Sequence, residues 1–92
     1  MPRVELTRHL HRFFPQLHGT EIAVSGDTVA QVVEELNHIA PGVLFYLCDE
    51  QGRLRQHVNI FINNERIRDR RNLSDPVEPD TCVYILQALS GG

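Results

Sequence analysis

The chain has 92 residues, of which 41% are hydrophobic and 23% are charged, and its formal net charge is −3. A single core needs roughly 50–200 residues, so one domain is expected, and the acidic balance argues against a nucleic-acid-binding module. No apolar run approaches the roughly 20 residues that span a bilayer, and the N-terminus carries no apolar secretion signal. We therefore expect a cytoplasmic protein that binds neither membranes nor nucleic acids.

The first quarter of the chain predicts two strands. In residues 3–10, alternation places Val4 and Leu6 on one side of a strand. Residues 20–26 alternate in the same way and stop at a glycine. We expect these two strands to form an antiparallel pair with a long connection.

Residues 26–42 change to a helical period and predict the main helix. Thr28 and Gln31 have the spacing of a capping box, in which the Thr28 hydroxyl accepts from the Gln31 amide while the Gln31 side chain reaches back. Asp27 is the other candidate for the cap, and the Pro-Gly pair that follows ends the helix. The apolar residues recur three and four positions apart, at Val29, Val32, Val33, Leu36, Ile39 and Ala40.

The second half of the chain predicts an apolar turn and three strands separated by polar loops. Residues 43–47 form a helical turn beneath the core, and residues 57–63 form the clearest strand, with alternate apolar positions. Asn63-Asn64 suits a tight turn, because asparagine tolerates a positive φ. Residues 66–68 are expected to return as a short strand, and residues 81–88 to close the chain as another.

These elements predict an α+β fold of the β-grasp type. One helix cannot cover both faces of a sheet, so we expect a mixed sheet of four or five strands with one main helix packed on one face. The last strand is expected in the interior of the sheet, beside the first. Residues 1–92 would form a single domain, with residues 88–92 as a flexible C-terminal tail.

No residue pattern indicates catalysis or metal binding. His9 and His11 would share one face of a strand, but no third ligand stands at a recognisable spacing. Cys48 and Cys82 are far apart, so we expect reduced and mostly buried thiols, with one disulfide as the alternative. The chain is therefore expected to bind no metal and no cofactor, and to act as a carrier rather than as an enzyme.

All nine basic residues are arginine, and the sequence contains no lysine. Arg66, Arg68, Arg70 and Arg71 lie close together near the last loop. They indicate either a partner-binding patch or solvated charge paired with Asp69, because charge runs alone rarely specify a function.

The sequence finishes with LQALSGG, and Gly91 and Gly92 follow the last predicted strand by a few residues. Glycine has no Cβ, so it passes a narrow enzyme channel, adopts any φ and leaves its carbonyl open to attack. A carboxylate is itself a poor electrophile, and a partner enzyme would have to activate it. A frayed end is the simpler interpretation, because flexible ends are common.

In this combination of fold and ending, the chain resembles the ubiquitin-like sulfur carriers. That group includes the small subunit of molybdopterin synthase and the carrier of the thiamine pathway. The resemblance is strongest in residues 26–36, 57–68 and 83–92, and it is closest in appearance to the carrier that serves a cysteine synthase. The loop at residues 48–57 is longer and more polar than in the molybdopterin synthase subunit, which argues against that role.

The resemblance implies that an E1-like enzyme adenylates the carboxylate of Gly92 with ATP. Sulfur from a persulfide donor would displace AMP and leave a thiocarboxylate, which delivers sulfide to an enzyme such as a cysteine synthase. Gly91 and Ser90 would thread into the partner, and a metalloprotease is a further possible partner that processes the tail.

The same resemblance implies apolar partner contacts near the tail, at Leu86 and Leu89. Strand alternation places Phe61 on the sheet face away from the helix, as a further contact. Arg66 and Arg68, from the arginine cluster, would add charge. Two alternatives stay open. A ubiquitin-like modifier would be conjugated through Gly92 and, lacking lysine, could not form lysine-linked chains of itself, although drift toward arginine explains the same composition. A non-catalytic binding module would have a disordered tail.

Overall fold

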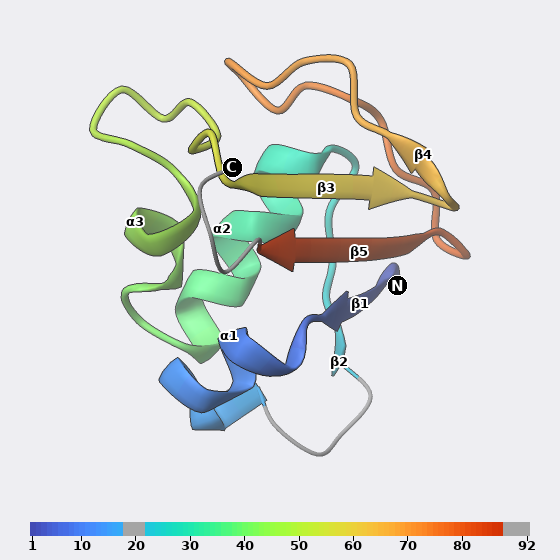
Figure 1. Ribbon diagram of the computed structural model, residues 1–92. Coiled ribbons are helices and arrows are strands. Elements are labelled where there is room, and N and C mark those ends of the chain that lie inside the picture. Colours follow the sequence, from blue (N-terminus) through green and yellow to red (C-terminus); the bar gives the residue numbers. More distant parts are fainter. Residues whose placement is uncertain (18–21, 88–92) are drawn as a thin grey trace.

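The structure is a computed structural model, and it describes residues 1–17 and 22–87. A five-stranded sheet forms one layer and the main helix, α2, forms the other (Figure 1). The elements in chain order are β1 (Arg3–Leu6), α1 (Arg8–Phe13), a 3-10 turn (Pro15–Leu17), β2 (Ile22–Ala23), α2 (Val29–Ile39), α3 (Val43–Leu47), β3 (Val58–Ile62), β4 (Glu65–Arg66) and β5 (Cys82–Gln87).

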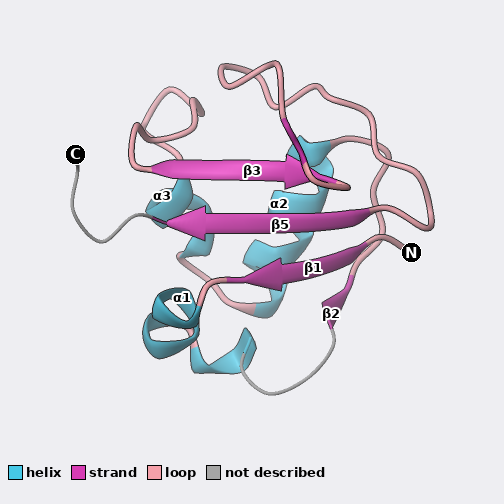
Figure 2. Ribbon diagram, turned by 45° about the vertical axis from the view of Figure 1, so that its right-hand side comes forward, coloured by secondary structure: helices cyan, strands magenta, loops and turns pink. Residues whose placement is uncertain are grey.

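The sheet has the order β2-β1-β5-β3-β4, which confirms the predicted mixed sheet. The last strand, β5, lies between β1, to which it runs parallel, and β3, to which it runs antiparallel. Helix α2 crosses one face of the sheet, and the opposite face carries no helix across β3 and β5 (Figure 2). We call the face away from α2 the open face.

The face toward α2 is packed with branched aliphatic side chains. Strands β3 and β5 contribute Val58, Ile60, Val83 and Ile85, all with no exposed surface. Burying one such side chain stabilises the fold by about 1.5–3 kcal/mol. Helix α2 contributes four equally buried residues, which form one stripe along the helix: Val29, Val32, Val33 and Leu36.

The predicted cap of α2 is present, with one difference in detail. The Thr28 hydroxyl accepts a hydrogen bond from the Gln31 amide at 3.3 Å. The Gln31 side chain reaches back one residue further than expected and accepts from the Asp27 amide at 2.6 Å. Two of the amides at the helix start are therefore satisfied. The helix ends before Gly42, whose φ of 103° is a conformation that favours glycine.

The prediction of a strand through residue 10 was wrong. The strand ends at Leu6, and residues 8–13 form α1, which buries Leu10 completely. The spacing of Leu10, Phe14 and Leu17 is helical, and this packing outweighs the alternation. His9 and His11 therefore lie on a helix and do not share the face of a strand.

Two smaller expectations were wrong, and a third is confirmed. Ile39 was predicted on the buried stripe of α2 but is 45% exposed, because it lies at the edge of the stripe that Leu36 and Ala40 continue. The returning strand is β4 at Glu65–Arg66 and not residues 66–68, although the Ile67 amide still donates to the Ile60 carbonyl. The turn before it is confirmed, because Asn63 and Asn64 both have positive φ, 47° and 74°.

Candidate functional site

A row of four side chains crosses the open face from β1 to β4. Tyr84 of β5 pairs in register with Glu5 on one side and with Phe61 on the other, and Phe61 pairs with Arg66. Because paired residues project on the same face of a sheet, these side chains are neighbours. We call this set, Glu5, Tyr84, Phe61 and Arg66, the aromatic row. It places two aromatic rings between a carboxylate and a guanidinium.

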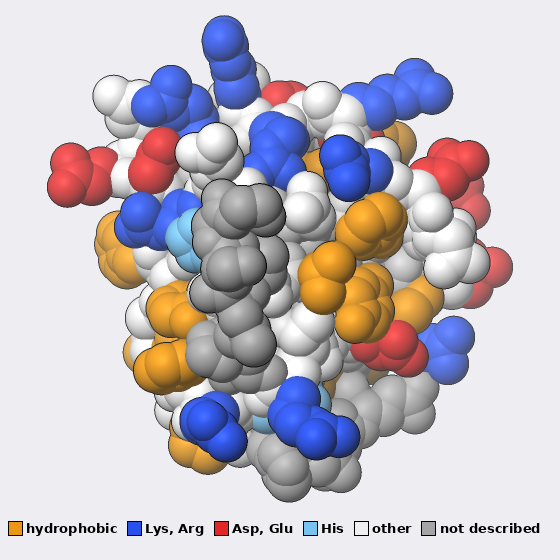
Figure 3. Space-filling view, viewed as in Figure 1, with side chains coloured by type: hydrophobic (Ala, Val, Ile, Leu, Met, Phe, Trp, Pro, Cys, Tyr) orange, Lys and Arg blue, Asp and Glu red, His pale blue; other side chains and the backbone are white. Residues whose placement is uncertain are grey.

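The aromatic row borders a shallow cleft on the open face. The cleft encloses about 550 Å³ and is lined by Glu5, Phe61, Asn63, Asn64, Cys82 and Tyr84. The Arg66 guanidinium lies over the Phe61 ring, 5.9 Å from its centroid, at cation–π distance. In the space-filling view, hydrophobic side chains gather on this face below a band of arginines (Figure 3). An apolar surface with a charged border is typical of a protein-binding site.

The end of β5 lies beside the start of β3. Gln87, the last described residue, pairs with Val58, and Leu86 pairs with Asn59 on the open face. Four of the residues assigned to the tail and its contacts lie outside the described residues: Leu89, Ser90, Gly91 and Gly92.

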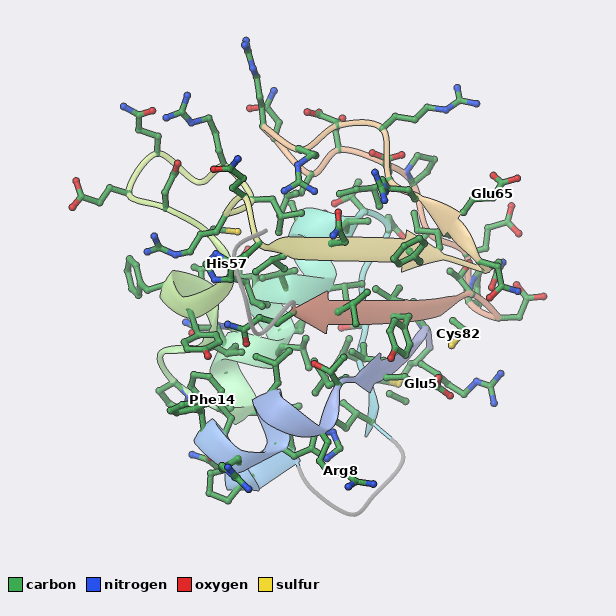
Figure 4. All side chains as sticks on the ribbon, in the orientation of Figure 1. Glu5, Arg8, Phe14, His57, Glu65 and Cys82 are labelled. Carbon is green, nitrogen blue, oxygen red and sulfur yellow. The ribbon has the colours of Figure 1, made fainter. Side chains whose placement is uncertain are left out.

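Arginines from two distant loops meet above this strand end. They line a groove of about 690 Å³ whose residues are Asp49, Arg53, Leu54, Arg55, Gln56, His57, Asn59, Arg66, Arg70 and Arg71. The Leu54 amide donates to the Arg70 carbonyl at 2.8 Å, which joins the loop after α3 to the loop after β4. We call this feature the arginine groove. His57, at the start of β3, marks the groove's position beside the strand end (Figure 4).

Two of the groove's arginines are fixed by backbone carbonyls. The Arg70 guanidinium donates to the carbonyls of Arg55 and Val58 and to the Asn59 side chain, at 2.8–3.1 Å. The Arg55 guanidinium donates to the Phe45 carbonyl through two nitrogens, at 2.8 and 3.0 Å. Arg70 therefore supports the groove, and its side chain is held in one orientation.

One interpretation of the arginine cluster was that its charges pair with Asp69. The structure shows no such pairing among the residues it describes. The Asp69 carboxylate accepts from the amides of Arg71 and Asn72 and from the Ser74 hydroxyl. The Ser74 hydrogen bond, followed by the Asn72 amide, lowers the pKa of Asp69. Asp75 likewise accepts from the amides of Arg68 and Asp69. Both carboxylates shape the loop through its backbone.

The two cysteines are free thiols in different environments. Cys48 is buried, and burial, followed by the nearby Asp49 charge, raises its pKa, although Arg55 opposes the shift. Cys82 is half-buried at the start of β5 and faces the cleft on the open face. Within residues 1–17 and 22–87, no group of three or more histidine, cysteine or acidic side chains could hold a metal ion. No helix in the same part of the chain is long and apolar enough to cross a membrane.

Three of the predicted partner contacts lie on the sheet: Phe61 on β3, Arg66 on β4 and Leu86 on β5. Phe61 faces away from α2, as expected. The side chain of Arg68 is exposed but lines neither the cleft nor the groove. Sequence reasoning missed Tyr84 and Glu5 as members of the same surface. Their alternation with the buried residues of β5 and β1 was the available signal.

Comparison with known proteins places the chain in a family. The ThiS family model matches residues 12–92. The sulfur carrier protein CysO of Mycobacterium tuberculosis is 33% identical over 73 residues, which cover 77% of this chain and 78% of that relative.

Solved structures agree with this fold. CysO of M. tuberculosis has a TM-score of 0.81 at 28% identity, covering 97% of this chain and 100% of its own. The Amycolatopsis orientalis BexX/CysO complex gives 0.84 at 22% identity, covering 100% of both chains. SAMP1 of Haloferax volcanii gives 0.76 at 21% identity, covering 99% and 98%. The chain belongs to the ThiS family, and it is a β-grasp, ubiquitin-like carrier of the CysO and ThiS type and not a catalyst.

Proposed function

We propose that the chain carries sulfur as a thiocarboxylate on Gly92 and donates it in the biosynthesis of cysteine or another sulfur-containing metabolite. The carboxylate attacks the α-phosphate of ATP on an E1-like enzyme, and pyrophosphate leaves. A persulfide sulfur then displaces AMP from the acyl adenylate, and reductive cleavage of the resulting S–S bond by a thiol leaves the thiocarboxylate. ATP is a substrate of the partner and is not bound by this chain alone.

The observation that carries the proposal is the family match, which extends through Gly91 and Gly92. Its support from geometry is the position of β5. This central strand carries Tyr84 of the aromatic row and ends three residues later at Gln87, which pairs with Val58 below the arginine groove. A partner that takes up Gly92, threaded through Ser90 and Gly91, would therefore meet both surfaces at once. Leu86 and Leu89 would supply apolar contacts along the way.

The proposed partners follow from the chemistry. An E1-like enzyme activates the carboxylate, a persulfide donor supplies sulfur, and a sulfur-accepting enzyme such as a cysteine synthase consumes it. A metalloprotease that processes the tail would complete the set. The activation and sulfur-transfer steps act on the C-terminal carboxyl group of Gly92, and none requires a catalytic group from the described part of the chain.

The test is the intact mass of the protein isolated from its native host during growth on limiting sulfur. We expect a fraction whose mass rises by the replacement of one oxygen with one sulfur, mapped to Gly92 in the C-terminal peptide. A chain lacking Gly92 is the matched control and should show no such fraction. An unmodified mass throughout, or conversion only to high-mass conjugates through Gly92, would overturn the proposal, and the second result would identify a protein modifier.

A further inference from the structure

We propose that the arginine groove is a docking site for an acidic segment of a partner protein, with an apolar residue of that segment placed on Phe61. The inference rests on the proposed function only in naming the partner as the enzyme that takes up Gly92. The groove itself is argued from the charges, hydrogen bonds and position of its residues.

Part of the positive charge in the groove is left unneutralised. Arg66 and Arg71 line the groove and are exposed, and neither side chain forms a hydrogen bond or an ion pair with another described residue. Asp69 and Asp75 are occupied, because they accept from backbone amides. Glu65 pairs with Ile62 and therefore projects to the other side of β4 from Arg66. A carboxylate from outside therefore meets two available guanidinium groups, which bind carboxylates in a two-pronged geometry.

The groove is already ordered without a partner. Arg55 and Arg70 are fixed to the carbonyls of Phe45 and Val58, and the two loops are joined through Leu54. Binding to a surface whose side chains are already held loses less conformational entropy. The fixed arginines form the floor, and Arg66 and Arg71 remain able to adjust to the partner.

The arginine groove is continuous with the aromatic row. Arg66 lines the groove and also lies over Phe61, so one residue belongs to both surfaces. The fitting occupant combines acidic residues, which face the arginines, with an apolar residue, which contacts Phe61 and Tyr84. Such a segment would lie beside Gln87, where β5 ends. A partner held there has the tail within reach.

A protein segment fits better than a nucleic acid. The chain has a net charge of −3, which repels a polyanion at long range, while a short acidic segment on a protein senses chiefly the local groove. Asp49 also lines the groove and is paired with Arg53 at 3.3 Å. A second copy of the chain is the competing protein occupant, because acidic residues line a hollow beside α2, at Asp27, Glu34 and Glu35.

The test is a titration of the isotopically labelled full chain, observed by NMR, with a synthetic peptide of six glutamates around one leucine. We expect amide shifts confined to the groove, Phe61 and Tyr84, and binding that weakens as salt screens the charges. The peptide with glutamine in place of glutamate should not bind. Arg66→Glu together with Arg71→Glu should weaken binding about tenfold or more, because two attractions become repulsions.

The matched control is Arg8→Glu together with Arg12→Glu, which changes the net charge equally on exposed residues of α1. It should retain the binding of the parent chain, and urea unfolding should show that both double variants are folded. Equal loss in the control, shifts away from the groove, tighter binding of a single-stranded RNA, or self-association that the groove variant abolishes would each overturn the inference. These titrations use the unmodified chain. The docking proposal can therefore fail while the thiocarboxylate is still found, and the proposed function can fail while the peptide still binds.

Discussion

The two faces of the sheet are built from the same strands but differ in the side chains they carry and in how deeply these are buried. On the face toward α2, β3 and β5 place four fully buried aliphatic side chains, Val58, Ile60, Val83 and Ile85. On the open face, the alternate residues Phe61 and Tyr84 remain half-exposed. Strand alternation therefore lets one strand provide stability and recognition at the same time. Changes on one face should leave the property served by the other face nearly intact.

The largest expected effect comes from breaking the buried face. Ile85→Ala should lower the free energy of unfolding by about 2–5 kcal/mol, because it removes buried methylene groups and leaves a cavity. Leu86→Ala is the matched control on the next residue, which is half-buried on the open face, and should cost about 1 kcal/mol or less. Urea unfolding of both variants measures the difference. Equal losses would show that the two faces are not independent.

The second prediction concerns recognition on the open face. Phe61→Ala should reduce the rate at which Gly92 is converted to a thiocarboxylate in the host by about tenfold, because aromatic residues dominate contact surfaces. Phe45→Ala removes an equally large side chain that is 66% exposed on α3, away from this face, and should leave the rate unchanged. Mass spectrometry gives the modified fraction. The partner-binding role of Phe61 is refuted if the two variants behave alike while both remain folded.

The smallest expected effect is a change in the free energy of unfolding with pH that arises from a carboxylate in a loop. The buried side chains of the described core include one polar residue, Thr81, and no titratable carboxylate, so acid should act elsewhere. The folded-state pKa of Asp69 is lowered, so its contribution to stability is present above the unfolded pKa of about 3.9 and is lost as the pH falls through the lower folded value.

Asp69→Asn should therefore show a smaller drop in the free energy of unfolding between pH 5 and pH 2 than the parent chain. Asp80→Asn, at an exposed carboxylate that accepts no hydrogen bond from another described residue, is the control and should follow the parent. Urea titrations at several pH values measure these drops. A parent-like curve for Asp69→Asn would place the acid sensitivity in another group.

Local patterns predicted the buried face well. The capping pair Thr28 and Gln31 and the spacing of the valines in α2 are short-range signals, and the structure follows them. Helix α1 was missed although Arg8 already breaks the alternation of Val4 and Leu6, because the evidence for a helix lies in the later packing of Leu10 and Leu17. Where local patterns conflict, burial decides, and burial is a property of the whole fold.

The arginine groove could be predicted only in part. Arg66, Arg70 and Arg71 formed a visible cluster, but Arg53 and Arg55 stand more than ten residues away in the sequence. They join the groove because the Leu54 amide bonds to the Arg70 carbonyl, a long-range contact between two irregular loops. Loops carry no periodicity from which such a contact could be inferred. The distinction between fixed and available arginines likewise depends on which carbonyls they reach.

The central position of β5 also sets how the protein responds to force. Every residue of β5 pairs with β1, with β3 or with both, along opposite edges. A pull on the chain beyond Gln87 acts along the strand, so it strains both ladders together in shear and does not peel one bond after another. A two-residue edge strand such as β4 would not resist a pull in this way. An enzyme that draws the end of this chain into a channel can therefore apply traction to it while the rest of the fold stays intact.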